Sequence, residues 1–295
     1  MTEVTEKAGW NTRALRPETG DKLQYHIRCR PGDVAEYVLL PGDPERVPLI
    51  AARWDTARTI SNYREHVTYT GTLGSIPVSA CSTGAGGGST ASALEELAAL
   101  GAKTFIRVGT TAALQEDINC GDLIICAGAV RRDGTSPQYV EPAYPALASY
   151  EVVLALVQAA ENLALPYHVG LACTTASFYC GQGRPGFGGY RQSFMDHLVE
   201  DMKGAGVLNF EMEAATVLTL SQLFRLRAGA VFAVVANRIR DEFNYTGAGI
   251  EKSVVVANEA VRLLAGWDAR KRQAGKRYFF PGLLIPPEEK AQEMS

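Results

Sequence analysis

The chain has few of the features that would place it among membrane, secreted or nucleic-acid-binding proteins. No run of apolar residues approaches the roughly 18 needed to cross a bilayer, and residues 1–6 are polar and acidic where a signal peptide would be basic and then apolar. A formal net charge of −3 provides no broad basic surface for nucleic acid or anionic lipid. We therefore expect a cytoplasmic protein whose partners include neither nucleic acid nor membrane.

Cysteine shows no metal-binding or disulfide pattern. The chain has no CxxC pair among its six cysteines, and several of them lie in apolar strand-like runs. The six are Cys29, Cys81, Cys120, Cys126, Cys173 and Cys180. The Walker lysine motif and the spaced glycines of a dinucleotide-binding loop are both absent. The sequence thus favours a reduced protein with no structural zinc and no nucleotide cofactor.

What the chain does have is enough apolar sequence for one large core. It contains 295 residues, of which 46% are hydrophobic, and no low-complexity block marks a linker. We predict one domain over residues 25–267, between an N-terminal arm (1–24) and a C-terminal extension (268–295).

Strand-like and helix-like segments alternate along this domain. Predicted strands cover residues 37–41, 68–72, 77–82, 104–109, 123–127, 167–174, 207–210 and 230–236. Predicted helices cover residues 91–100, 150–163, 191–204, 211–225 and 249–266, and a further one follows Pro44. This alternation predicts an α/β fold with a central mixed β-sheet flanked by helices.

Two carboxylates, Glu211 and Glu213, directly follow an apolar strand. Paired sugar hydroxyls could donate charge-assisted hydrogen bonds to such acids, so a polyol is one candidate ligand. The alternative is a helix start at which acids face the positive end of the helix dipole.

Groups that bind anions gather near the ends of other predicted strands. Gly42 opens a helix start that carries Arg46, and Arg107 and Thr110 lie near the end of another strand. The glycine-rich turn at residues 84–88 adds backbone N–H groups. Together these features predict a phosphate site, although a single strand-end arginine is more commonly part of a salt bridge.

A third group lies in residues 177–184. Phe178 could stack on a flat heterocycle while Gln182 and Arg184 hydrogen-bond to its edge, although a plain surface loop would have a similar composition. Phosphate, polyol and heterocycle subsites together describe a nucleoside and a phosphate.

Six motifs in order carry a resemblance to a known family: residues 40–47 (LPGDPERV), 82–87 (STGAGG), 107–111 (RVGTT), 178–184 (FYCGQGR), 209–213 (NFEME) and 237–238 (NR). Over about residues 24–267 the chain resembles the uridine phosphorylases, in the hexamer- or trimer-forming branch of the nucleoside phosphorylase superfamily. The resemblance implies a partly barrel-like sheet and reversible phosphorolysis of uridine, with deoxyuridine as a further candidate substrate. Inorganic phosphate would be a co-substrate, and no cofactor is expected.

The resemblance also implies a role for individual residues. Phosphate would be held by Gly42, Arg46, Arg64, Arg107 and Thr110, ribose by His26, Glu211, Met212 and Glu213, and uracil by Phe178, Gln182, Arg184 and Arg238. Of these, Arg107, Gln182, Arg184 and Glu213 would be the catalytic residues. Some relatives place a monovalent cation between subunits, at positions that correspond to Glu65, Ala85 and Ser89; no other metal is expected.

The same resemblance implies a homo-oligomer, with dimers assembled into a hexamer and each active site shared between two subunits. His26 would reach the ribose 5′-hydroxyl of the neighbouring subunit, and Arg64 would complete its phosphate site. Read without the resemblance, His26 is a surface or capping histidine and Arg64 an exposed strand charge.

The expected reaction needs no covalent nucleophile. Phosphate would attack the anomeric carbon while the glycosidic bond breaks, and Gln182 and Arg184 would stabilise the departing uracil anion. A pyrimidine is favoured over a purine because Asn237 and Arg238 stand where purine-cleaving relatives carry an aspartate, and Asp241 reads as a loop carboxylate.

Cys180 and Gly183 depart from the expected uracil loop, so an inosine or guanosine phosphorylase is the alternative. A nucleoside hydrolase is disfavoured by the arginines around an anion. A catalytically silent nucleoside-binding relative is disfavoured because both arginines and carboxylates are kept.

Overall fold

The computed structural model describes residue 15 and residues 17–285. Most of the predicted N-terminal arm, including residues 1–6, therefore lies outside the described residues, as does the end of the predicted C-terminal extension.

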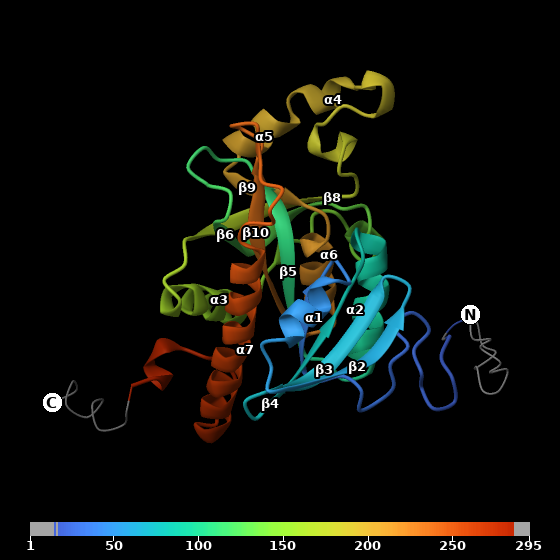
Figure 1. The fold of residues 1–295 in the computed structure, drawn as a ribbon, viewed down its shortest axis with the longest axis vertical. Coiled ribbons are helices and arrows are strands. Elements are labelled where there is room, and N and C mark those ends of the chain that lie inside the picture. Colours follow the sequence, from blue (N-terminus) through green and yellow to red (C-terminus); the bar gives the residue numbers. More distant parts are fainter. Residues whose placement is uncertain (1–14, 16, 286–295) are drawn as a thin grey trace.

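Strands and helices alternate through most of the described chain (Figure 1). The strands are β1 (Tyr37–Pro41), β2 (Thr56–Tyr63), β3 (His66–Leu73), β4 (Ile76–Cys81), β5 (Thr104–Ala113), β6 (Leu123–Arg132), β7 (Ala146–Leu147), β8 (Tyr167–Thr175), β9 (Val207–Glu211), β10 (Arg227–Asn237) and β11 (Glu242–Phe243). The α-helices are α1 (Arg46–Ala51), α2 (Gly87–Ala99), α3 (Tyr150–Asn162), α4 (Ser193–Asp196), α5 (Leu198–Gly204), α6 (Ala214–Leu223) and α7 (Ile250–Gln273).

The strands form one mixed sheet, part of which closes into a barrel. Strand β5 pairs in parallel with β10 and antiparallel with β9, and β10, β6, β8 and β9 are joined in that order. Five strands thus make a closed ring, while β1, β4, β3 and β2 extend the sheet to one side. The predicted α/β fold with a mixed, partly barrel-like sheet is confirmed.

Helices cover both faces of the sheet, so its central strands are buried on both sides. Phe105 on β5 packs in the core that includes residues of α2 and α6. The next residue, Ile106, packs in a second core with residues of α1, α3 and α7. Successive side chains of a strand point to opposite faces, and both faces of β5 are covered, which explains why nearly all of its residues are buried rather than every second one.

Several elements differ from the prediction. Strand β2 was not predicted, because it lies at the sheet edge with mostly exposed residues and so lacks an apolar pattern. The helix predicted over residues 191–204 is two short helices, with His197 between α4 and α5. The strand predicted to end at Gly109 continues to Ala113, and the last predicted helix continues to Gln273.

The C-terminal part of the described chain packs on its own subunit. The Phe279 ring stacks on Trp267 of α7 with ring centroids 4.1 Å apart, and its backbone N–H donates to Glu151 Oε1 at 3.0 Å. Phe279 is buried, whereas the neighbouring Tyr278 and Phe280 are exposed. This segment therefore covers the end of the seam between α3 and α7.

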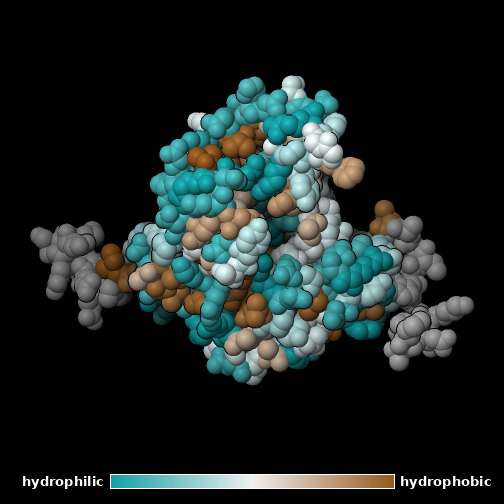
Figure 2. All heavy atoms as spheres, turned by 45° about the horizontal axis from the view of Figure 1, so that its top comes forward, coloured by the Kyte–Doolittle hydropathy of each residue, from teal (hydrophilic) through white to brown (hydrophobic). Residues whose placement is uncertain are grey.

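No helix within the described part of the chain is long and apolar enough to cross a membrane. Figure 2 looks toward the end of the molecule that carries α4 and shows hydrophilic side chains over most of that face, with hydrophobic ones in scattered groups.

Candidate active site

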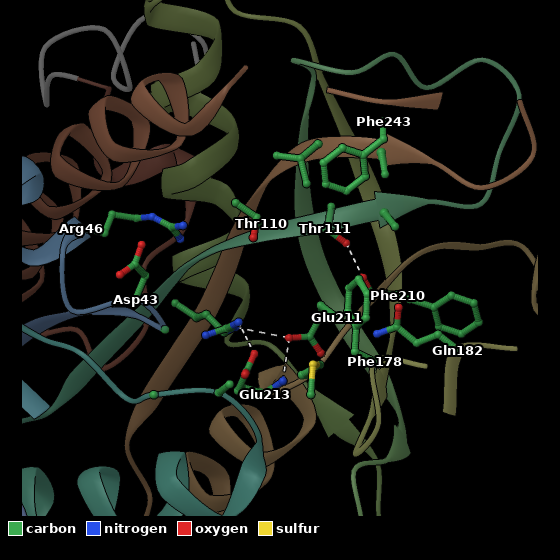
Figure 3. Close-up of a pocket in the computed structure, with 18 of the residues that line it drawn as sticks. Asp43, Arg46, Thr110, Thr111, Phe178, Gln182, Phe210, Glu211, Glu213 and Phe243 are labelled. Atoms are coloured by element: carbon green, nitrogen blue, oxygen red, sulfur yellow. Dashed lines mark hydrogen bonds and ion pairs between the residues drawn. The ribbon is translucent and has the colours of Figure 1, made fainter. Parts of the chain in front are cut away.

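A cavity of about 420 Å³ lies beside β5 and β9, and ten of the residues predicted to bind phosphate, ribose or base line it (Figure 3). Its predicted lining residues are Gly42, Arg46, Arg107, Thr110, Phe178, Gln182, Arg184, Glu211, Met212 and Glu213. Segments that are far apart in the sequence thus meet at one site, as the motif analysis required.

Arg107 and two carboxylates form the centre of this cavity. Arg107 Nε donates to Glu211 Oε2 at 3.3 Å, and Arg107 Nη2 donates to Glu213 Oε2. All three side chains are almost fully buried, with residue exposures of 3 to 4%. Buried charges of this kind are stable only when they are paired and hydrogen-bonded, so the triad is a preorganised polar centre.

The ends of two elements hold the carboxylates in place. Glu211 is the last residue of β9, and its Oε2 accepts hydrogen bonds from the backbone N–H groups of Glu213 and Ala214, both at 2.8 Å. Thr174, near the end of β8, donates to Glu211 Oε1. Glu213 directly precedes α6, and its Oε1 accepts from the Gly86 N–H at 2.6 Å. Both carboxylates thus lie at the start of α6, as the helix-start interpretation expects, and both line the cavity, as the ligand-site interpretation expects.

Burial raises the pKa of Glu211 more than the nearby Arg107 guanidinium lowers it. The cavity thus holds a carboxyl group that a ligand with hydroxyl donors would stabilise in its charged form.

One end of the cavity carries unused hydrogen-bond donors. Arg107 Nη1 is buried and has no hydrogen-bond partner among the described residues. Arg46 Nη1 donates to the carbonyl of Val108 at 3.1 Å, and burial lowers the pKa of Arg46. Gly42 and Thr110 line the same cavity. An orphaned guanidinium N–H next to a second arginine is the arrangement expected for an oxyanion site.

The charge at this end is nonetheless close to balanced within one chain. Arg46 and Arg107 face three carboxylates of the cavity lining, those of Asp43, Glu211 and Glu213. A dianion such as phosphate would be bound more favourably if a further cation came from outside the chain.

The other end of the cavity suits a flat polar ring. Phe178 is 45% exposed, and the Arg184 guanidinium carbon lies 4.1 Å from its ring centroid. Arg184 Nη1 donates to Gln182 Oε1 at 2.5 Å, which leaves the Gln182 amino group to donate elsewhere. Burial, with Arg238 nearby, lowers the pKa of Arg184 to about 10.

Arg238 and Asn237 lie behind the cavity rather than in its lining. Arg238 Nη1 donates to the backbone carbonyl of Gln182 at 2.9 Å and so supports that loop. Asn237 Nδ2 donates to the carbonyls of Gln115 and Ile118 at 2.9 and 2.8 Å. Asn237 Oδ1 accepts from the N–H groups of Ile239 and Arg240. Asn237 therefore shapes the turn after β10, with its polar atoms already used.

His26 and Arg64 do not line the cavity of their own chain. They lie together on the surface, joined by Tyr25. The Tyr25 and His26 rings meet edge to face at 4.9 Å, and Arg64 Nη2 donates to the Tyr25 hydroxyl at 3.3 Å. Arg64 also has a backbone φ of 55°, which is rare for a residue other than glycine. The two residues that the resemblance assigns to a neighbouring subunit thus form one patch.

Of the three positions implied for a monovalent cation, two contact each other. Ser89 Oγ donates to Glu65 Oε1 at 3.0 Å, whereas Ala85 lines the cavity. The described residues contain no cluster of three His, Cys, Asp or Glu side chains that could hold a metal. The cation site is implied only by the resemblance and stays a prediction.

Sequence reasoning missed several lining residues, among them Asp43, Thr111, Phe210, Val235 and Phe243. Asp43 lies within the motif of residues 40–47, so the sequence did contain a signal for it. Phe243 belongs to the two-residue strand β11, which pairs with β10 after the loop, and no local pattern marks it.

Comparison with known proteins shows the family of this chain. The sequence model of the phosphorylase superfamily matches residues 36–266. The chain is 57% identical over 270 residues to a uridine phosphorylase of Thermococcus kodakarensis, covering 92% of this chain and 97% of that protein. It is 40% identical over 223 residues to a uridine phosphorylase of Escherichia coli, covering 74% and 87%. A guanosine phosphorylase of Halorubrum lacusprofundi is 37% identical over 216 residues, covering 73% and 84%. The chain belongs to the phosphorylase superfamily.

Proposed function

We propose that this protein is an enzyme, a pentosyltransferase that catalyses the reversible phosphorolysis of uridine to uracil and ribose 1-phosphate. The observation that carries the proposal is the buried Arg107, held by two carboxylates while its Nη1 has no partner in the described structure. Relatives named uridine phosphorylase, at 57% and 40% identity, support uridine as the substrate.

In this proposal Glu211 and Glu213 accept hydrogen bonds from the ribose hydroxyls, with Met212 beside the sugar. Phosphate lies against Arg46, Arg107, Thr110 and the N–H of Gly42. One phosphate oxygen attacks C1′ as the bond from C1′ to the uracil nitrogen breaks, and the bonding electrons leave with uracil. The phosphate dianion stabilises the positive charge that develops on the sugar.

The base end of the cavity stabilises the leaving group. Uracil would stack on Phe178, while the Gln182 amino group and Arg184 donate to its carbonyl oxygens. Because Arg184 stays charged at neutral pH even with a pKa lowered to about 10, its positive charge is available where negative charge develops. Arg238 would act through the Gln182 backbone.

We further propose a homohexamer assembled from dimers, in which a second subunit completes each site. His26 and Arg64 share a surface patch outside their own cavity, and the near-balanced charge around Arg46 and Arg107 would favour another cation. Arg64 of one subunit would bind phosphate in the other, and His26 would bind its ribose. A cytoplasmic location and a role in pyrimidine salvage belong to the same proposal.

A purine substrate is the second candidate, supported by the guanosine phosphorylase at 37% identity. The sequence disfavours a purine because Asn237 and Arg238 stand in place of an aspartate. Asn237 uses its polar atoms in the turn after β10 and does not line the cavity, so its identity says little about which base is bound.

Product analysis tests the proposal. Incubation of the enzyme with uridine and inorganic phosphate should yield uracil and ribose 1-phosphate in equal amounts. Free ribose as the sugar product would instead identify a nucleoside hydrolase, and the proposal would then be wrong.

A further inference from the structure

Glu96, near the end of α2, holds the segment that carries His26. Its two carboxylate oxygens accept hydrogen bonds from the His26 N–H at 3.0 Å and from the Ile27 N–H at 2.9 Å. The same carboxylate lies 2.7 Å from His26 Nδ1. One acidic side chain therefore fixes both the backbone and the ring of His26.

This contact decides which ring nitrogen can meet a ligand. A carboxylate can only accept, so Nδ1 carries a proton and donates to Glu96, and Nε2 is left for another partner. The ring is partly exposed, with a side-chain exposure of 32%, whereas Glu96 is only 12% exposed. His26 is thus a surface group held from behind by a mostly buried acid.

The backbone beneath the ring is anchored as well. Ile27 is fully buried in the same core cluster as Leu94 and Leu97 of α2. On the other side, the Gln24 N–H donates to the carbonyl of Cys29 at 2.9 Å, which closes the segment into a loop. The direction of the His26 ring is therefore set by Glu96 on a rigid support, as in sites where a carboxylate orients a ligand-binding histidine.

The same helix also reaches the cavity of its own chain. Gly86, directly before α2, donates to Glu213, and Gly84 and Ala85 line the cavity. A helix of 13 residues is about 20 Å long, so its start borders one cavity while its last turn supports His26 well away from it.

We propose that Glu96 is a positioning residue for substrate recognition: it orients His26 so that Nε2 binds the 5′-hydroxyl of the nucleoside in the second subunit's cavity. The inference rests on the proposed function and on shared active sites. It assigns to Glu96 the recognition of one hydroxyl group, and no part in bond breaking.

The test compares uridine with 5′-deoxyuridine, which lacks that hydroxyl, in the full-length enzyme. Glu96→Gln removes the charge but keeps the size of the side chain, so kcat/KM for uridine should fall about tenfold, chiefly through KM. For 5′-deoxyuridine, kcat/KM should change less than about twofold, because its binding does not use His26. Glu96→Asp, which keeps the charge, should recover part of the lost uridine activity.

Glu95→Gln is the matched control, since Glu95 is an exposed acid on the same helix and makes none of these hydrogen bonds. It should leave both substrates unaffected. His26→Ala should reproduce the loss seen in Glu96→Gln, and the double variant should lose little more than either single one, because the two residues act as a unit.

Two results would overturn the inference: an equal loss for uridine and 5′-deoxyuridine, which would indicate a structural role, or no loss for either. If the wild type cleaves a purine nucleoside instead, that nucleoside and its 5′-deoxy form replace the uridine pair. The uridine proposal would then have failed while the role of Glu96 is still tested.

Discussion

Arg107 Nε lies 3.3 Å from Glu211 Oε2, while Nη1 of the same guanidinium is buried with no hydrogen-bond partner among the described residues. The planar guanidinium group can donate in several directions at once. In the proposed reaction it therefore contacts the carboxylates that bind ribose and the phosphate that attacks it, and fixes the two reactants relative to each other.

Arg107→Lys should lower kcat/KM for phosphate by about 100-fold, because an ammonium group keeps the charge but loses the planar set of donors. Steady-state kinetics with varied phosphate would measure this. Arg53→Lys, at a surface pair with Glu251, is the control and should have no effect. Arg107→Ala should abolish phosphate dependence and most activity; wild-type phosphorolysis in that variant would refute the phosphate assignment.

Gln182→Ala should reduce the turnover of uridine selectively, by about tenfold or more, because it removes a donor to a uracil carbonyl and the acceptor of the Arg184 hydrogen bond. Parallel assays with uridine, thymidine and inosine would show whether the loss depends on the base. An equal loss for every nucleoside would remove the proposed role of Gln182 in base recognition.

Mixing two inactive variants should restore activity if the sites are shared. The Arg64→Ala subunit lacks the arginine that acts in its partner's site, and the Arg107→Ala subunit lacks the arginine that acts in its own site. In a mixed dimer the site of the Arg64→Ala subunit therefore has both arginines, and the other site has neither. Random reassociation of equal amounts should recover about a quarter of the wild-type activity. Complementation depends on exchange between subunits, which mixing differently tagged chains would verify. Exchange without recovery of activity would show that Arg64 acts within its own chain or not at all.

The sequence predicted which residues would line the cavity better than it predicted the bounds of the helices and strands that carry them. Glu211, Glu213 and Arg107 were recognisable because charged residues in or beside apolar strands need partners, and the cavity contains all three. Their mutual pairing was not predictable, because Arg107 and Glu211 meet only through the antiparallel contact of β5 with β9, more than a hundred residues apart.

The elements that were missed lacked a local signal. Strand β2 is largely exposed, and the break at His197 divides a segment of helical composition. The last helix extends to Gln273 because residues beyond the predicted end find partners in the folded chain: Lys271 bonds to Glu151, and Asp268 to Arg227. Such long-range pairs are invisible in a window of sequence.

Asp268→Asn should destabilise the enzyme through that same network. Burial alone would raise the pKa of Asp268. Hydrogen bonds from Arg227, Lys271 and Tyr37 outweigh burial and lower this pKa from 3.8 to about 2. The charged form therefore contributes stability above about pH 4, and this contribution is lost as the pH falls through about 2.

Allowing for solvent screening, the free energy of unfolding at pH 7 should fall by about 1 kcal/mol in this variant. Urea unfolding at several pH values would measure it, with the exposed Asp117→Asn as control. The difference from wild type should stay constant down to about pH 4 and then shrink. A difference that grew on acidification would contradict the assignment.

The central claim is that the cavity binds a nucleoside and uses phosphate to cleave it. The most direct test is nucleoside consumption with and without inorganic phosphate, using uridine, thymidine, inosine, guanosine and adenosine in parallel. We predict cleavage of uridine that requires phosphate and exceeds that of the purine nucleosides. Cleavage that proceeds equally without phosphate, or no cleavage of any of the five nucleosides, would contradict this account.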